Sequence, residues 1–281
     1  MRRLCTLLLL LGFLPVGAFS LSLKDDITIL LRERQVQNLD RTGLTLTFYV
    51  QIKNSSSKPY YLSGYSYRFV VDQAEYLRLQ TSLDSKLGLN PSEETLIALP
   101  VKITYEHLFR TIEGAQAKDK ALCYIMGELA FADEKKERGR LPFSFSGEFP
   151  IYRDPQVDLI ALNINMLTIG GADLNLGIKL INPNGFELLV QTVSYRIMIG
   201  DRPIGNGNIG GDKSIPSNGE KVFQIPFLLN FFEVGKEVYA FLQQDTTSCQ
   251  FSGEIEIQTV WGRLKTPFEV SKDIVINRPS S

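Results

Sequence analysis

The sequence contains the same module twice, and this repeat limits what the chain can fold into. Residues 54–68 align without a gap with residues 182–196, at a shift of 128 (182 − 54), and both stretches end in Ser-Tyr-Arg. Later in the modules the shift is 126 (249 − 123), where Cys123-x-x-x-Gly127-Glu128 aligns with Cys249-x-x-x-Gly253-Glu254. Such a repeat indicates one structural unit built two times. A residue that performs chemistry in both copies has to occur in both. A motif that is present in only one copy is therefore not a duplicated functional site.

The length and composition fit two folded domains of ordinary size. The chain has 281 residues, of which 44% are hydrophobic and 22% are charged, a balance typical of globular domains and not of disordered chains. Together with the repeat, this predicts a signal peptide over residues 1–20, a first β-sandwich over residues 21–152 and a second β-sandwich over residues 153–281.

The N-terminal segment is typical of a secretory signal peptide. Arg2 and Arg3 precede an apolar stretch over residues 4–14, and Val16-Gly17-Ala18 supplies a cleavage site of small residues. This stretch is shorter than the ~20 residues that span a bilayer, so cleavage is favoured over an uncleaved anchor, which stays open. We expect an exported protein, in a bacterial periplasm or cell envelope. In a eukaryotic secretory route, also open, Asn54-Ser55-Ser56 would be a glycosylation acceptor.

The charge balance argues against a nucleic-acid partner. The chain has 30 basic and 31 acidic residues, a net charge of −1, and removal of Arg2 and Arg3 leaves 28 against 31, or −3. No basic patch stands out from this background, as nucleic-acid binding would require. The partner class that remains is an unknown protein or lipid, and association with an envelope membrane is open.

Alternating apolar and polar residues predict strands at equivalent places in both modules. Residues 44–53 and 172–179 alternate at every step, which is the period of a strand with one buried and one solvated face. Further strands are expected at 65–71, 97–102, 123–131 and 143–151, and at 193–199, 222–227, 249–257 and 268–276. The resulting fold class is mainly β: two tandem antiparallel β-sandwiches of the fibronectin or immunoglobulin type, each with one helix.

The helix of each module falls between late strands. In the first module, apolar residues at helical spacing from Tyr105 to Ile112 follow Thr104, a candidate cap. In the second module, residues 231–241 follow Asn230, with Glu233 three positions on, as in a capping box. Thr104 and Asn230 are equivalent at the shift of 126 (230 − 104), so the cap itself belongs to the repeat.

These residues resemble the late embryogenesis abundant type 2 family, also called the water stress and hypersensitive response (WHy) domain. The resemblance rests on the alternating strand that runs into Asn182-Pro183-Asn184, on Ser194-Tyr195-Arg196 and on Ile225-Pro226-Phe227. The first module departs from it with Asn54-Ser55-Ser56 in place of the Asn-Pro-Asn turn. The resemblance implies tandem WHy domains, fibronectin-like sandwiches with one helix, a link to desiccation and freezing stress, and no catalytic residues.

Several single residues invite a catalytic or binding interpretation that the repeat does not support. His107, the one histidine, aligns with Glu233. The stretch from Gly205 to Gly210 matches the dinucleotide pattern G-x-G-x-x-G, but no helix is expected after it, so we interpret it as a flexible connection between strands. The asparagines at 54 and 182 are interpreted as turn residues.

The remaining duplicated residues are also interpreted structurally. Cys123 and Cys249 share a face with buried apolar residues, so we predict two unpaired core thiols in separate sandwiches rather than a disulfide. Glu128 and Glu254 each lie alone on a solvated face. The pairs Tyr67-Arg68 and Tyr195-Arg196 predict a surface cation–π or edge contact, with anion binding as the less favoured alternative.

The sequence thus predicts no catalytic, cofactor-binding or metal-binding residues, and no cofactor. The favoured function is that of a non-catalytic, exported, stress-protective or binding protein of the cell envelope that acts by surface contacts. The alternative is a carrier or scaffold for a lipid or another hydrophobic ligand, with a groove in or between the sandwiches. An enzyme is the least favoured class. An exposed apolar patch of more than a few hundred Å² would favour the carrier.

Overall fold

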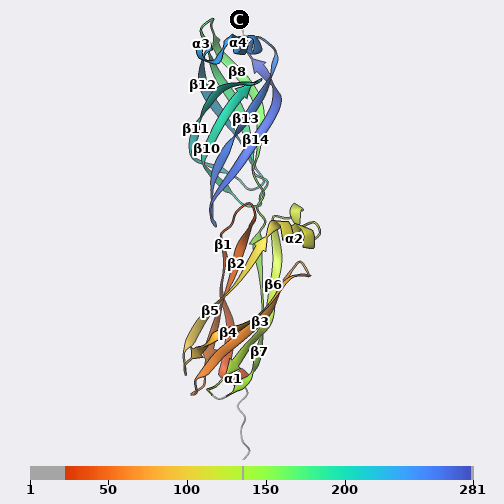
Figure 1. Ribbon diagram of the computed structural model, residues 1–281, viewed down its shortest axis with the longest axis vertical. Helices are drawn as coiled ribbons and strands as arrows, with labels where there is room; N and C mark the ends of the chain where they lie inside the picture. The colour runs from red at the N-terminus through yellow and green to blue at the C-terminus, as the bar shows by residue number, and fades with distance from the viewer. Residues whose placement is uncertain (1–22, 135, 280–281) are drawn as a thin grey trace, which may run out of the picture.

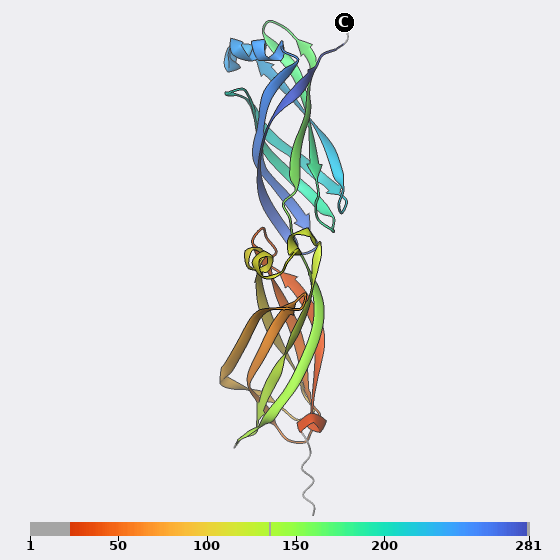
Figure 2. The same cartoon turned by 90° about the vertical axis from the view of Figure 1, so that its right-hand side faces the viewer.

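The strands form two β-rich units that follow one another along a single long axis (Figure 1). The computed structural model describes residues 23–134 and 136–279. The expected signal peptide, residues 1–20, lies outside this range. Within it, no helix has the length and apolar character needed to cross a membrane. A view turned by 90° shows the same end-to-end arrangement, with the short helices at the ends of the units (Figure 2).

The first unit consists of two antiparallel sheets. One has the strand order β1-β2-β5 and the other the order β4-β3-β6-β7. Arg34 crosses from β1 to β7, where its Nη1 donates to the carbonyl oxygen of Ser146 over 3.1 Å. The strands are β1 (Ile27–Gln37), β2 (Gly43–Asn54), β3 (Tyr60–Val71), β4 (Ala74–Leu89), β5 (Glu94–Thr104), β6 (Lys120–Ala132) and β7 (Glu137–Pro150).

The second unit has the same strand arrangement, joined into one sheet of order β11-β10-β13-β14-β8-β9-β12. The groups β8-β9-β12 and β11-β10-β13-β14 correspond to the two sheets of the first unit. A short parallel pairing of residues 275–277 with residues 161–163 connects them. The strands are β8 (Gln156–Leu167), β9 (Gly171–Ile181), β10 (Leu188–Ile199), β11 (Arg202–Ile215), β12 (Glu220–Asn230), β13 (Thr246–Thr259) and β14 (Gly262–Asn277).

The expected mainly β fold class is confirmed, and the alternating strands behave as the pattern requires. Every apolar residue of the alternating set in β2 and β9 is buried, which places these strands between the core and a solvated face. The buried residues of this set are Leu44, Leu46, Phe48, Val50, Ile52, Ala172, Leu174, Leu176, Ile178 and Leu180.

Four strands were not expected from the sequence. β1, β4 and β11 each lie at the edge of a sheet, and β8 is the counterpart of β1. Position at an edge does not by itself explain the omission, because the edge strands β5, β7 and β12 were expected. The outer part of β1, residues 32–35, is exposed at every position.

The helical segments are shorter than expected. In the first unit, α1 (Leu23–Asp26), α2 (Tyr105–Thr111) and the 3-10 helix η1 (Ala115–Ala117) are present, and Thr104 precedes α2 without a side-chain cap bond. In the second unit the expected single helix is divided into α3 (Phe231–Val234) and α4 (Lys236–Leu242). The division falls at Gly235, whose φ of 100° an L side chain rarely adopts. Asn230 does cap α3, because its side chain accepts from the amide of Phe232.

Candidate functional site

Two equivalent asparagines hold the turn after the second strand of each group. Asn54 and Asn182 are fully buried. The Asn182 Nδ2 donates to the carbonyl oxygens of Phe186 (2.8 Å) and Pro216 (2.9 Å), and its Oδ1 accepts from the amide of Asn184 (2.9 Å). Asn54 makes the same kind of bonds to its own unit, so the predicted structural role of both residues is confirmed. A buried, fully bonded Nδ2 also means that the folded unit does not present Asn54 as a glycosylation acceptor.

Asn184 extends this network to the segment that links the units. Its Oδ1 accepts from the amide of Arg153 (2.7 Å) and its Nδ2 donates to the carbonyl oxygen of the same residue (2.8 Å). The Arg153 guanidinium forms an ion pair with Asp119 of the first unit. The first module has Ser56 at the equivalent position, and Ser56 bonds within its own turn to Asn54 and Lys58. The residue at this position therefore has a different role in each module: Asn184 bonds the linker, whereas Ser56 bonds only its own turn.

The rest of the linker is bonded to both units. The amide of Tyr152 donates to the hydroxyl of Tyr105 in the first unit (3.1 Å), and the Tyr152 hydroxyl meets Thr266 Oγ1 in the second (2.7 Å). The Asp154 carboxylate pairs with the Arg41 guanidinium at 2.7 Å. Burial raises the pKa of Tyr152 to about 12, so this phenol is neutral and available as a donor at physiological pH. The linker is a bonded part of the structure rather than a free connection.

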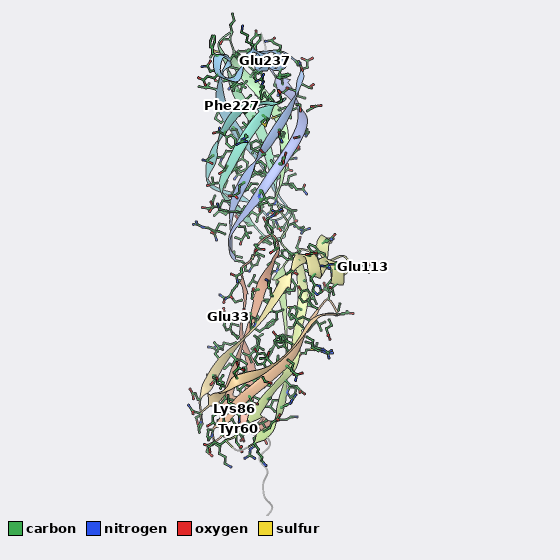
Figure 3. All side chains as sticks on the ribbon, in the orientation of Figure 1. Glu33, Tyr60, Lys86, Glu113, Phe227 and Glu237 are labelled. Carbon is green, nitrogen blue, oxygen red and sulfur yellow. The ribbon has the colours of Figure 1, made fainter. Side chains whose placement is uncertain are left out.

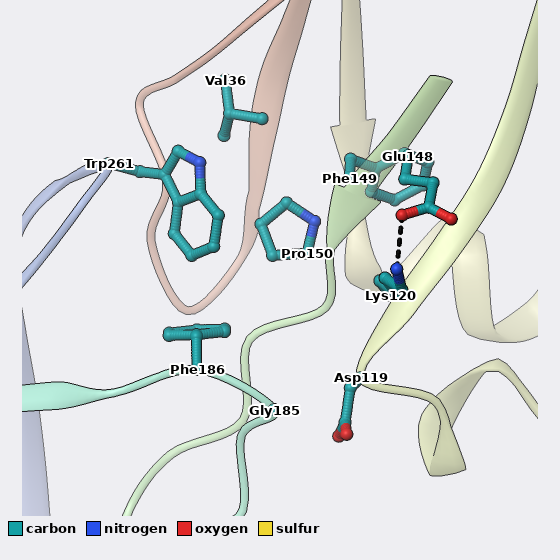
Figure 4. A pocket seen from close by; sticks show the side chains of 9 residues that line it. All are labelled: Val36, Asp119, Lys120, Glu148, Phe149, Pro150, Gly185, Phe186 and Trp261. Carbon is teal, nitrogen blue, oxygen red and sulfur yellow. Dashed lines mark hydrogen bonds and ion pairs between the residues drawn. The ribbon is translucent and has the colours of Figure 1, made fainter. Parts of the chain in front are cut away.

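Beside the linker lies an open cleft of about 320 Å³ to which both units contribute (Figure 4). The single tryptophan, Trp261, lies in the turn between β13 and β14 and meets Phe186 edge to face, with ring centroids 4.8 Å apart. The bond from Asn182 to the Phe186 carbonyl fixes the turn that carries this ring. Val36 of β1 and Pro150 of β7 complete the apolar wall. This volume is near the lower end for small-molecule sites.

The opposite wall of the cleft is polar and balanced in charge. Lys120 and Glu148 form an ion pair at 2.5 Å, and both side chains are at least half exposed. Such an exposed pair contributes little to stability, on the order of 0–1 kcal/mol. Asp119 lies below them and is already engaged by Arg153. The cleft can therefore accept an apolar group against Trp261 and Phe186, with polar groups at its rim, but it holds no arrangement of a nucleophile and a base.

Two of the three cysteines, Cys123 and Cys249, are located as predicted. Cys123 and Cys249 are buried, unpaired thiols on β6 and β13, in the cores of different units. Burial raises the pKa of each thiol to about 12, which disfavours the reactive thiolate.

The histidine and the duplicated glutamates lie on three different elements, α2, β6 and β13. His107 is exposed on α2, where its ring packs against Tyr76 with centroids 4.6 Å apart. Glu128 pairs with Arg140 at 4.0 Å and Glu254 with Lys265 at 3.1 Å, both on exposed strand faces. Within the described residues, no group of three or more His, Cys, Asp or Glu side chains is placed to hold a metal ion.

The glycine-rich stretch 205–210 is part of strand β11, so its interpretation as a flexible connection is wrong. As expected, a turn and the strand β12 follow it, and no helix begins there. One of its glycines has a packing reason: Gly207 pairs with Tyr195 across the sheet, and a Cβ at Gly207 would lie 2.7 Å from the Tyr195 hydroxyl. The aromatic ring lies over the space that glycine leaves.

The predicted contact between each tyrosine and the following arginine is also wrong. Neighbouring residues of a strand point to opposite faces. Tyr67 is buried and donates its hydroxyl to the carbonyl oxygen of Pro100 (3.0 Å), whereas Arg68 is exposed. Tyr195 is half-buried against Phe251, with ring centroids 5.6 Å apart, and Arg196 is exposed.

The repeat placed the join between the modules near Tyr152, but the bonds of the linker and the residues of the cleft were not identified from the sequence. Trp261 and Phe186 come from turns 75 residues apart (261 − 186), and alternation in strands gives no information about turns. One sequence feature could have indicated the turn that carries Trp261. Val260 and Trp261 are two large apolar residues at the tip of a hairpin, where polar residues are the rule.

Comparison with known proteins supports the family for the second unit. Residues 178–272, about a third of the chain, match the family model described as late embryogenesis abundant protein. The match starts in β9 and ends in β14, so it covers most of the second unit. A search of curated proteins found no match.

Three solved structures show distant likenesses. A crystal structure of a protein from Archaeoglobus fulgidus has 11% identity and a TM-score of 0.33, covering 45% of this chain and 96% of that one. Red sea bream transglutaminase has 9% identity and a TM-score of 0.27, over 88% of this chain and 31% of that chain. The YadV chaperone has 10% identity and a TM-score of 0.23, over 89% and 100%. These scores are too low to support an argument about fold or function.

Proposed function

We propose that the protein is a non-catalytic, stress-protective binding protein that is exported to the cell envelope and acts by surface contacts. The family match over residues 178–272 supports a stress-related role. The signal-peptide pattern of residues 1–20 supports export to a periplasm or envelope. In this proposal both units are WHy-like domains, the first over residues 21–152 and the second over residues 153–281.

The observation that carries the proposal is the distribution of the repeated residues. The residues shared by both units include ones that build the fold: Asn54 with Asn182 in the turn network, and Cys123 with Cys249 in the cores. Other exposed positions differ between the copies, as His107 and Glu233 illustrate, although the exposed pairs Arg68 with Arg196 and Glu128 with Glu254 are shared. A duplicated fold with two different surfaces supports a function that lies in surface contacts.

Freeze–thaw inactivation of a labile enzyme tests this function. The purified protein is added to lactate dehydrogenase, and an equal mass of serum albumin serves as the control for nonspecific protection. We expect the protein to preserve several times more enzyme activity than albumin does after repeated cycles. Protection no better than that of albumin contradicts the proposed shielding role.

A second candidate function is the binding of a lipid or another hydrophobic ligand in the cleft between the units. The specific observation in its favour is the apolar wall of Trp261, Phe186 and Val36. Native mass spectrometry of the purified protein looks for a co-purified lipid, and the fluorescence of the single tryptophan reports titration with a fatty acid. A saturable change that the Phe186→Ser variant lacks supports the carrier. No adduct and no change contradict it.

A further inference from the structure

The free end of the second unit carries a group of strongly exposed apolar side chains. We call Met166, Ile169, Leu228 and Phe232 the distal apolar patch. Their exposed fractions are 60%, 91%, 79% and 88%. They come from the end of β8, the turn before β9, the end of β12 and the start of α3. Together these elements form the pole of the molecule near α4 and the C-terminus (Figure 1).

The members of the patch are neighbours in the structure. Met166 and Leu228 both pair with Asp173 of β9, one from each side. The amide of Phe231 donates to the carbonyl oxygen of Gly170 (3.1 Å), which brings the start of α3 to the turn that carries Ile169. A Cβ built on Gly170 would lie 3.7 Å from the ring of Phe232. The patch is therefore one continuous surface rather than four isolated residues.

The equivalent end of the first unit has the same backbone. The amide of Asp40 donates to Gly43 O over 2.9 Å, and the amide of Thr168 donates to Gly171 O over the same distance. The bond from Tyr105 N to Thr42 O (2.8 Å) corresponds to the bond from Phe231 N to Gly170 O. These bonds make Arg41 the counterpart of Ile169 and Glu106 the counterpart of Phe232.

The side chains at these matched positions have the opposite character. Arg41, Glu106 and Lys102 in the first unit replace Ile169, Phe232 and Leu228 in the second, and all three are exposed. The fold thus accepts charged residues at these places, so the apolar side chains are not needed for folding. At this end of the first unit the second unit is attached, through Arg41 and Asp154. At the end of the second unit no further unit of the described chain follows.

The shape of the patch indicates what it contacts. Its most exposed side chains project from a turn and a helix start, so they form a convex surface and not a groove. Four side chains of this size expose on the order of 500 Å² of surface. A stable protein interface buries about 800 Å² on each partner, and a second copy would also have to offer a matching hollow. A lipid surface needs no matching hollow, because its chains deform around an inserted side chain.

The charges around the patch fit a zwitterionic surface. Glu233, Lys236 and Glu237 are exposed on α3 and α4, so both signs are present at the rim. Figure 3 shows Glu237 at this pole, far from Tyr60 and Lys86 at the other. Phosphatidylcholine and phosphatidylethanolamine carry both signs in each headgroup. Tyr239 of α4, 37% exposed, adds the kind of aromatic residue that is enriched at membrane interfaces.

We propose that the distal apolar patch inserts into the surface of a phospholipid membrane and that the protein binds this surface with the pole of its second unit. Ile169 and Phe232 enter the boundary between headgroups and acyl chains, and the charged rim stays among the headgroups. The inference rests on the proposed surface-contact function and specifies a partner for it.

The test is co-flotation of the purified protein with phosphatidylcholine vesicles, with a second set that contains phosphatidylglycerol. The decisive variant, Ile169→Arg with Phe232→Glu, installs the residues that the first unit has at these places. We expect a loss of at least about ten-fold in vesicle partitioning, because two large apolar side chains no longer insert. Val260→Glu is the matched control: Val260 is 87% exposed, but it lies at the other end of the unit, and binding should be unchanged.

A second measurement reports insertion directly. In a Trp261→Phe variant that also carries Phe232→Trp, brominated lipids should quench the fluorescence of the new tryptophan. Absence of vesicle binding by the parent protein overturns the inference, as does binding that survives Ile169→Arg with Phe232→Glu. Self-association that this variant abolishes, without lipid binding, assigns the patch to a second copy instead. The freeze–thaw assay contains no lipid, so its outcome and the vesicle outcome are read separately.

Discussion

At the scale of single residues, Asn182 shows how one buried side chain determines a turn. Its amide group bonds the backbone of Phe186, Pro216 and Asn184 at once. Replacement by alanine leaves buried carbonyl and amide groups without partners, each at a cost of about 1–3 kcal/mol. We therefore expect Asn182→Ala to lower the free energy of unfolding by about 3 kcal/mol in urea titrations. Asn206→Ala, at an exposed position of β11, is the control, and an equal effect of both variants would contradict the assignment.

The buried thiols predict a specific response to alkaline pH. The pKa of Cys123 and Cys249 rises from the ordinary value of 9.0 to about 12 in the folded protein. Below pH 9 the thiols keep their protons in both states and their contribution to stability is complete. Between pH 9 and about 12 the unfolded chain loses protons that the folded chain retains, so stability falls as pH rises.

Urea unfolding at pH 8.0 and pH 9.5 measures this response. We expect the midpoint to fall over this interval, and to fall less in the Cys123→Ala, Cys249→Ala double variant. The buried phenols, such as Tyr67 with a pKa of about 12, contribute only at higher pH, because their ordinary value is 10.0. Alkylation of either thiol by iodoacetamide in the folded protein at pH 8, at the rate seen in urea, would show that the thiols are not enclosed.

At the scale of elements, strands with a regular buried face could be predicted, the edge strands β5, β7 and β12 among them, whereas β1, β4, β8 and β11 could not. β2 and β9 alternate without exception, and their predicted ranges lie within the observed ones. β11 was missed because its glycines have low strand propensity, and the reason for one of them, the ring of Tyr195, lies on the neighbouring strand. The cleft and the distal apolar patch depend on which turns meet in space, which no local pattern encodes.

The duplicated glycine of β6 and β13 illustrates the close approach of two strands. A Cβ at Gly253 would lie 1.9 Å from the carbonyl oxygen of Ser194, and one at Gly127 would lie 2.0 Å from that of Ser66. Because backbone has to move in response, we expect Gly253→Ala to destabilise the protein by about 2–3 kcal/mol, measured by thermal unfolding. Gly210→Ala is the matched control on β11, since nothing lies within 4 Å of its built Cβ. Similar losses in the two variants would refute this explanation of the motif.

At the scale of the whole molecule, the linker is bonded to both units, and we expect the two units to move as one rigid body. Asn184 holds the backbone of Arg153 on both sides, and Tyr152 is bonded to Tyr105 and Thr266. In NMR relaxation measurements we expect both units of the parent protein to tumble with one rotational correlation time. Asn184→Ala should separate the two times.

Lys120→Ala provides the control for that measurement, because it removes an exposed ion pair beside the linker without touching a linker bond. Circular dichroism verifies that both variants remain folded. Two different correlation times in the parent protein would contradict the rigid junction, whatever the variants show.

The two matched ends of the units have different evolutionary freedom. Arg41 at the first end is committed to Asp154, so a change there has to be matched by a second change in the same chain. A change of Ile169 or Phe232 at the second end needs no matching change at a partner residue in the linker, although the backbone at both ends has the same hydrogen bonds. After the duplication, this end of the first unit is constrained by its contact with the linker to the second unit. The free end of the second unit can change its side chains without a matching change elsewhere in the fold.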